Sequence, residues 1–203
     1  MSSAIEWGVA SRALPGQPAS GDINVVKGFS DGVLVAAVDG LGHGEEAATA
    51  AAVAAATLEK HAAEPVMTLV QRCHEALRAT RGVAMSIASF NVARGLLTWL
   101  GVGNVEGVLL RRSAVRAEAE MPLLLRGGVV GFQLPPLDVE VVPVSAGDTL
   151  IFATDGIQSD FARGLARNFP PQQAAEKILA RYGKATDDAL VLVARYVGNG
   201  VRE

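Results

Sequence analysis

The sequence has little cysteine, few aromatic residues and few charges. Its 203 residues include one cysteine, 5% aromatic residues and 19% charged residues. The single thiol, Cys73, excludes an intramolecular disulfide and a zinc site with two or more cysteine ligands, so any metal would be held mainly by oxygen. Hydrophobic residues make up 50% of the chain, which excludes general disorder, and Ala, Val and Leu have to supply most of the core.

Three further absences narrow the class of protein. Lys and Arg (18) are outnumbered by Asp and Glu (21) and form no basic stripe, so nucleic acid is not an expected partner. No cationic stretch precedes an apolar segment at the N-terminus, and the longest low-charge run, Ala47–Leu58, is too short to span a bilayer. From these two absences we expect a cytoplasmic protein without membrane association. Because no linker or repeat divides the chain, we expect one domain over residues 1–203.

The order of hydrophobic patterns predicts an α+β fold. Short apolar runs predict strands, and the hairpin-length connections between them require antiparallel pairing. The architecture we expect is a four-layer α-β-β-α sandwich, in which helix pairs flank two packed antiparallel sheets. The expected strands are 33–38, 84–92, 96–102, 105–111, 115–119, 138–144, 149–153 and 189–196, and the expected helices are 45–63, 66–80, 158–167 and 171–182.

Four aspartates stand beside predicted buried strands: Asp22, Asp39, Asp155 and Asp187. Asp39 and Asp155 each end an apolar run, so a strand would bring each carboxylate to the rim of the core. A glycine follows each of them and leaves room for its backbone carbonyl to turn toward the same point. Several carboxylates at one place repel one another unless a hard cation lies between them, and Mg²⁺ or Mn²⁺ suits such oxygen ligands.

Each aspartate taken alone also fits the more common role of a turn residue or a helix cap. Asp31-Gly32 and Gly147-Asp148 fall between strands that should pair, so we interpret them as turns. Asp39 differs because Leu41-Gly42-His43-Gly44 is a glycine-rich loop before a helix and is too long for a tight hairpin. Such a loop permits close approach of phosphate to the backbone, although it lacks the Gly-Lys-Ser/Thr of a Walker loop.

The ordered series SGD, VDGLGHG, TDGI and DDALVLV, between residues 20 and 193, resembles the metal-dependent protein phosphatases of the PPM family. The likeness is strongest to the bacterial SpoIIE-type branch, and it covers nearly the whole chain. The segments AGDTLIFATDG (146–156) and GNV (103–105) add to it. A free-standing domain of this length with TRGVAMS (80–86) is similar to the feedback phosphatases of that branch that act on stressosome proteins.

The resemblance implies a binuclear Mn²⁺ or Mg²⁺ centre in which Asp39 bridges the two ions. Asp155 and Asp187 would complete the protein ligands of one ion. The carbonyl of Gly40 and the carboxylate of Asp22, directly or through water, would serve the other. Such ions would activate a water molecule for attack on phosphorus, so no covalent phosphoenzyme is expected.

Two roles remain open at this stage. Asp188 is the alternative to its neighbour Asp187 as a ligand. His43 could protonate the leaving oxygen, or it could be a solvent-facing residue at the start of a helix, since in the family the histidine usually follows Asp-Gly directly. Cys73 lies on the apolar face of an expected helix without a surrounding phosphate loop, so a thiolate nucleophile is not expected.

Two positions depart from the family pattern. Pro18 stands where many PPM enzymes have a phosphate-binding arginine, for which Arg12 is only a distant candidate, and Leu190 stands where Thr or Ser is common. Metals alone would then hold the phosphate, and specificity would depend on protein docking. The resemblance implies a serine/threonine phosphatase for phosphorylated STAS-domain stressosome proteins, acting in feedback control of the bacterial stress response. The alternatives are a phosphoprotein-docking scaffold and a metal-dependent hydrolase of small phosphate esters.

Overall fold

The computed structural model describes residues 4–17, 19–112, 120–163, 165 and 169–198. The elements of this part of the chain are mostly strands, with two helices after the third strand and one before the last. They are, in order, β1 (Ile5–Arg12), β2 (Asp22–Phe29), β3 (Gly32–Gly40), α1 (Glu45–Lys60), α2 (Val66–Ala76), β4 (Val83–Asn91), β5 (Leu96–Val102), β6 (Glu106–Leu110), β7 (Glu120–Pro122), β8 (Leu125–Arg126), β9 (Glu140–Pro143), β10 (Thr149–Ala153), α3 (Pro171–Tyr182) and β11 (Ala189–Tyr196).

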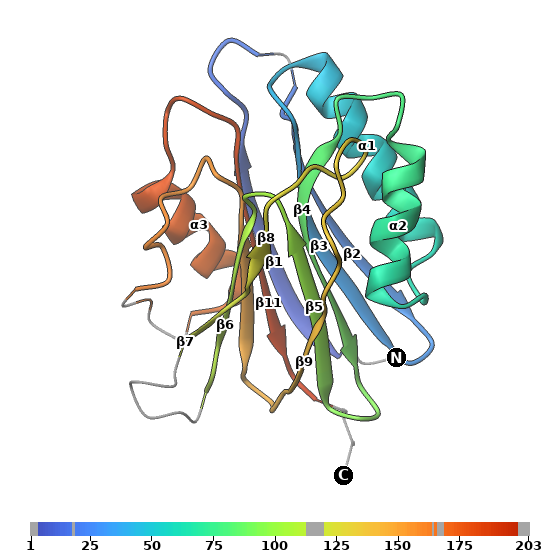
Figure 1. Ribbon diagram of the computed structural model, residues 1–203. Coiled ribbons are helices and arrows are strands. Elements are labelled where there is room, and N and C mark those ends of the chain that lie inside the picture. Colours follow the sequence, from blue (N-terminus) through green and yellow to red (C-terminus); the bar gives the residue numbers. More distant parts are fainter. Residues whose placement is uncertain (1–3, 18, 113–119, 164, 166–168, 199–203) are drawn as a thin grey trace.

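The strands form two sheets that lie face to face (Figure 1). The first sheet has the order β1-β11-β10-β6-β7, and all its pairs are antiparallel. The second has the order β2-β3-β4-β5-β8, with β9 also antiparallel to β5 and the short β8 parallel to β5. Helices α1 and α2 cover the outer face of the second sheet, and α3 covers the outer face of the first.

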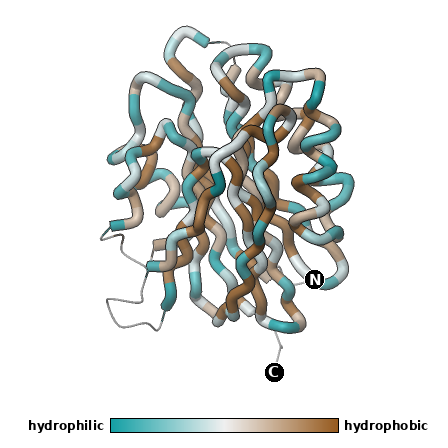
Figure 2. The backbone as a smooth tube through the Cα atoms, in the orientation of Figure 1, coloured by the Kyte–Doolittle hydropathy of each residue, from teal (hydrophilic) through white to brown (hydrophobic). Residues whose placement is uncertain are grey.

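Hydrophobic side chains fill three layers between these elements. One layer lies between the two sheets and contains the fully buried Phe90, Trp99 and Phe152. The second lies under α1 and α2, where alanines of α1 allow the helix to approach the sheet closely, and the third lies under α3. Figure 2 shows the hydrophobic residues concentrated along the strands. None of α1, α2 and α3 has the length and apolar character of a membrane-spanning helix in the described chain.

The structure confirms the α+β class and the two sheets, and corrects the helix content. Strands 96–102, 149–153 and 189–196 have the expected bounds, and the expected helices 45–63 and 66–80 end earlier, at Lys60 and Ala76. The expected strand 115–119 lies outside the described residues.

The expected helix over residues 158–167 is wrong for the described residues of that segment, which form successive turns. Gln158 N–H donates to the carbonyl of Tyr182 in α3, and Phe161 N–H donates to the carbonyl of Gln158. The first amide of the segment is therefore tied to another element, and its local bonds span three residues. The described part of the chain thus has a helix pair on one flank and only α3 on the other.

Candidate metal centre

The fold brings the predicted aspartates together at one end of the two sheets. Asp22 and Asp39 face each other as Cα partners on the neighbouring strands β2 and β3. Asp155 follows the end of β10, and Asp187 and Asp188 precede the start of β11. Because β10 and β11 are antiparallel neighbours, the end of one strand lies beside the start of the other. Each sheet therefore contributes aspartates to one place, the acidic end of the fold, formed by Asp22, Asp39, Asp155, Asp187 and Asp188.

A threonine joins the two groups of aspartates across the sheets. Thr154 Oγ1, just after β10, donates a hydrogen bond of 2.7 Å to Asp22 Oδ2 on β2. The same hydroxyl oxygen accepts a bond of 2.9 Å from the amide of Leu190 on β11. Both Asp22 and Thr154 are buried, so this contact fixes the position of the Asp22 carboxylate relative to the first sheet.

Burial and mutual repulsion raise the pKa values of Asp22 and Asp39 and so favour their protonated forms. Burial, partly offset by the hydrogen bond from Thr154, raises the pKa of Asp22 to about 7, and the charges of Asp188, Asp155 and Asp187 contribute. Burial also raises the pKa of Asp39 to about 8, and the charge of Asp22 is the next largest cause. The site is therefore a set of partly buried carboxylates without enough positive charge around them.

Asp188 has a different environment from its neighbour Asp187. Its two carboxylate oxygens each accept a 2.7 Å hydrogen bond from a backbone amide, one from Leu14 and one from Gly21. The residue is only 4% exposed. Asp188 therefore ties the connection between β1 and β2 to the start of β11. Asp187 is less buried, and its Oδ1 accepts the amide of Asp188 at 2.9 Å.

Asp155 is held by two residues that the sequence did not single out as site residues. Asn104 Nδ2, between β5 and β6, donates to Asp155 Oδ2 at 2.7 Å, and Lys184 Nζ donates to the Asp155 carbonyl at 2.5 Å. Burial and the charge of Asp187 raise the pKa of Asp155, while Lys184 and Asn104 lower it. Arg12, the distant phosphate-binding candidate, donates to the carbonyl of Lys184. Its guanidinium thus supports the loop after α3.

Two glycines, Gly40 and Gly156, allow backbone segments around the site to pack closely against each other. A Cβ on Gly40 would lie 2.1 Å from the carbonyl oxygen of Ala47 in α1, and a Cβ on Gly156 would lie 1.8 Å from the carbonyl oxygen of Asp188. Any other residue at these positions would push apart α1 and β3, or the ends of β10 and β11. Gly40 N–H donates to the carbonyl of Gly21 at 3.0 Å, which holds the strand ends carrying Asp22 and Asp39 together.

His43 is exposed in the loop between β3 and α1, with glycines of positive φ on both sides. The other two histidines have structural contacts: His61 Nδ1 bonds to Glu64 at 2.9 Å, and His74 Nδ1 accepts the amide of Gly131 at 3.0 Å. Cys73 is fully buried in α2, where burial raises the pKa of its thiol to about 12. A reactive thiolate at Cys73 is thus incompatible with its surroundings.

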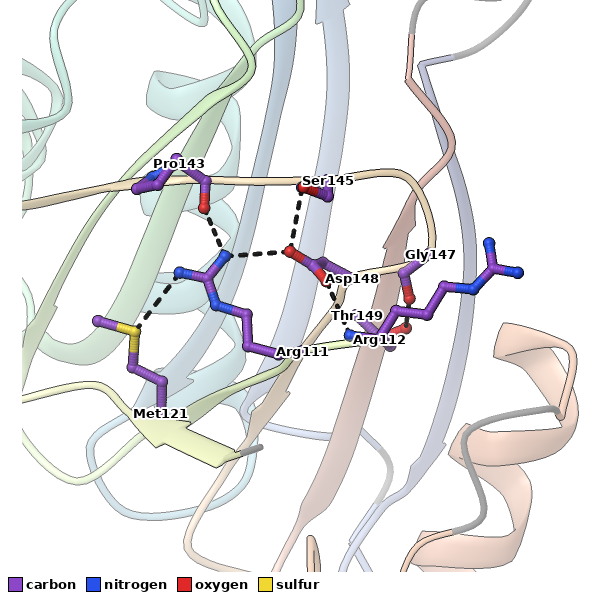
Figure 3. A network of polar contacts seen from close by, with 8 residues as sticks. All are labelled: Arg111, Arg112, Met121, Pro143, Ser145, Gly147, Asp148 and Thr149. Atoms are coloured by element: carbon purple, nitrogen blue, oxygen red, sulfur yellow. Dashed lines mark hydrogen bonds and ion pairs between the residues drawn. The ribbon is translucent and has the colours of Figure 1, made fainter. Parts of the chain in front are cut away.

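A further buried aspartate, Asp148, has its charge neutralised by a neighbouring cation. Asp148 lies before β10, at the opposite end of that strand from Asp155, within the turn expected at residues 146–148 (Figure 3). Its oxygens accept the amides of Arg112 and Ser145 and pair with the guanidinium of Arg111 at 3.0 Å. Asp148 therefore has a structural role, with a cation beside it, whereas no Lys or Arg among the described residues offsets the raised pKa of Asp22 or Asp39.

The donor set of the acidic end fits a hard cation by its chemistry. Carboxylates from both sheets lie near one another there, and each lowers the tendency of the others to ionise. As the side chains lie, however, no three Asp, Glu, His or Cys residues of the described chain already form a group that could hold one ion. The aspartates are close enough to interact as charges, and an ion would have to draw their carboxylates inward.

Comparisons with known proteins identify relatives over most of the chain. The family model described as Stage II sporulation protein E (SpoIIE) matches residues 30–197. Phosphoserine phosphatase RsbX of Bacillus subtilis (strain 168) is 26% identical over 178 residues, which cover 88% of this chain and 87% of the relative.

Solved structures share the fold. One, reported as "The bacterial stressosome: a modular system that has been adapted to control secondary messenger signaling", is 30% identical with a TM-score of 0.84, covering 94% of this chain and 99% of the other. The crystal structure of RsbX in complex with magnesium is 23% identical with a TM-score of 0.83, covering 94% of each chain. With the family model matched over most of its length, the chain belongs to the SpoIIE family of PPM-type protein serine/threonine phosphatases, which are metal-dependent hydrolases.

Proposed function

We propose that this phosphatase hydrolyses phosphoserine and phosphothreonine on STAS-domain proteins of a stressosome, using two Mg²⁺ or Mn²⁺ ions at the acidic end of the sheets. The observation that carries the proposal is the pairing of Asp22 with Asp39 on β2 and β3, beside Asp155 and Asp187 from the other sheet. The raised pKa values of Asp22 and Asp39 support the proposal, because a bound cation would favour the ionised form of these crowded carboxylates.

In this proposal Asp39 bridges the two ions. Asp155 and Asp187 complete the protein ligands of one ion, and the Gly40 carbonyl and Asp22 serve the other. Asp187 is preferred to Asp188 because both carboxylate oxygens of Asp188 already accept backbone amides, which tie the connection between β1 and β2 to the start of β11. When bound, such ions lower the pKa of a water molecule and offset negative charge on the phosphoryl group.

The chain's own residues would act on the substrate and on the ligands. His43, exposed on the loop beside Asp39, would donate a proton to the leaving serine or threonine oxygen. Asn104 and Lys184 would hold the two ends of Asp155, its carboxylate and its carbonyl, so that the ligand keeps one orientation. Thr154 would do the same for the carboxylate of Asp22.

The substrate and the cellular context are proposed from the relatives. RsbX is described as a phosphoserine phosphatase, and the structure at 30% identity concerns the bacterial stressosome. We place this chain in the cytoplasm as a feedback phosphatase of the stress response, where phosphorylated STAS-domain proteins would be its partners. The magnesium in the RsbX crystal structure supports Mg²⁺ or Mn²⁺ as the cofactor here.

Two assays test the proposal. Hydrolysis of p-nitrophenyl phosphate should require added Mn²⁺ or Mg²⁺, and Asp39→Asn should abolish it while the variant keeps the circular dichroism spectrum of the wild type. Absence of metal-stimulated turnover between pH 7 and 9 would instead indicate a docking scaffold. Comparison of a phosphorylated STAS-domain protein with free nucleotides tests the substrate, because faster nucleotide turnover would make the chain a hydrolase of small phosphate esters.

A further inference from the structure

A cavity of about 540 Å³ lies beside the acidic end, outside the proposed ligand set. Its walls come from β6, β7, the start of β8 and the turns that replace the expected helix over 158–167. The lining includes the charged residues Glu106, Glu120, Asp160 and Arg163 and the apolar residues Leu123 and Leu125. A volume of this size is in the range of cavities that bind small molecules or peptide side chains, roughly 300–1,000 Å³.

The cavity is connected to the proposed centre by two short stretches of backbone. Asn104, which bonds to the carboxylate of Asp155, is two residues before Glu106 of the cavity wall. Glu106 in turn is the Cα partner of Ala153, the last residue of β10. On the other side, the wall residue Asp160 follows Asp155 by five residues in the chain. A polypeptide with its phosphorylated residue at the acidic end can therefore extend a neighbouring side chain into the cavity.

The wall combines apolar surface with an excess of negative charge. Among the wall residues that the structure describes, three have carboxylates, Glu106, Glu120 and Asp160, and one, Arg163, has a guanidinium. Within the described chain these carboxylates make no hydrogen bond or ion pair with another side chain, in contrast to Glu64 or Asp148. The remaining wall is mostly apolar, which suits the methylene stem of a long cationic side chain whose charged end reaches the carboxylates.

We propose that this cavity receives a lysine or arginine side chain of the substrate protein, close in sequence to the phosphorylated residue, and so determines specificity. The inference rests on the proposed phosphatase function and adds a feature of its substrate. The charge of the cavity decides the occupant, because an acidic side chain would meet three carboxylates and an apolar one would leave them without a partner.

The test compares synthetic phosphoserine peptides that carry Lys or Gln at each position flanking the phosphoserine, with p-nitrophenyl phosphate as a substrate too small to reach the cavity. In the wild type, kcat/KM should be roughly fivefold higher for Lys than for Gln at one or two flanking positions, as expected for one ion pair at a partly exposed site. The double variant Asp160→Asn/Glu120→Gln should lose this preference and keep its turnover of p-nitrophenyl phosphate.

Two further variants keep the result interpretable. Asp31→Asn/Glu59→Gln removes the same charge from exposed positions outside the cavity and should keep the preference for Lys. Asp160→Lys leaves two acidic and two basic side chains among the described wall residues and should abolish the preference for Lys. No preference for Lys in the wild type, or a preference that survives in the double variant, would overturn the cavity proposal. Absence of p-nitrophenyl phosphate turnover by the wild type would contradict the proposed function instead.

Discussion

Replacement of Asp39 by asparagine should make the metal-free protein more stable at neutral and alkaline pH, although it removes the proposed bridging ligand. Burial, together with the charge of Asp22, raises the pKa of Asp39 from 3.8 to about 8 in the folded chain. Between these two pH values the unfolded chain has released this proton while the folded chain still holds it. Folding stability due to Asp39 is therefore fully present below pH 3.8 and is lost as pH rises toward 8.

The size of the effect follows from the same two pKa values. At about 1.4 kcal/mol per pKa unit, the change from 3.8 to about 8 corresponds to a loss on the order of 6 kcal/mol in the free energy of unfolding. Movement of the carboxylate toward water reduces this value, and we expect the metal-free Asp39→Asn variant to exceed the wild type by at least about 2 kcal/mol above pH 8. Near pH 4 the two proteins should be equally stable.

Urea denaturation in the presence of a chelator, at pH 4 and pH 8.5, measures this difference. Saturating Mn²⁺ should reverse the order, because ions that bind only the folded wild type stabilise it by mass action. Asp31→Asn, which changes an exposed turn residue between β2 and β3, is the matched control and should show neither effect. A metal-free Asp39→Asn variant that is no more stable than the wild type at pH 8.5 would refute the reasoning about buried, unneutralised charge.

Three other outcomes are expected. Asp188→Ala should lower the free energy of unfolding by about 2–4 kcal/mol in chemical denaturation, because the buried amide of Gly21 and the partly buried amide of Leu14 lose their acceptor. Asp148→Ala should lower it by a similar amount, about 2–4 kcal/mol, by leaving Arg111 without its carboxylate, yet p-nitrophenyl phosphate turnover at 20 °C should be unchanged. Cys73 should react with a thiol reagent only in denaturant, and rapid labelling of the native protein would contradict its burial.

Much of the fold follows from patterns that a single sequence displays. Continuous apolar runs such as 149–153 and 189–196 are buried on both faces between sheet and helix layers, and their bounds match β10 and β11. By contrast β1 exposes Glu6 and Trp7 and pairs with β11 from the far end of the chain, so its local pattern carries little signal. The segment 158–163, expected to be helical, forms turns, and its first amide bonds to the carbonyl of Tyr182 in α3.

Part of the site could also be predicted from the sequence. The turn at Asp31-Gly32 sets the register of the hairpin β2–β3, and that register alone places Asp22 opposite Asp39. The contacts of Asn104 and Lys184 with Asp155 join segments that are 51 and 29 residues apart, and no local pattern reports such contacts. Likewise the backbone donors to Asp188, which separate its role from that of Asp187, become visible only in three dimensions.

The central claim is that the aspartates at the end of the two sheets hold divalent cations. A crystal of the protein soaked in Mn²⁺ and measured near the manganese absorption edge tests it most directly. We predict two anomalous peaks, both within bonding distance of Asp39, with Asp155 and Asp187 beside one and Asp22 and the Gly40 carbonyl beside the other. Anomalous peaks elsewhere on the protein, or none at this end of the sheets, would contradict the account.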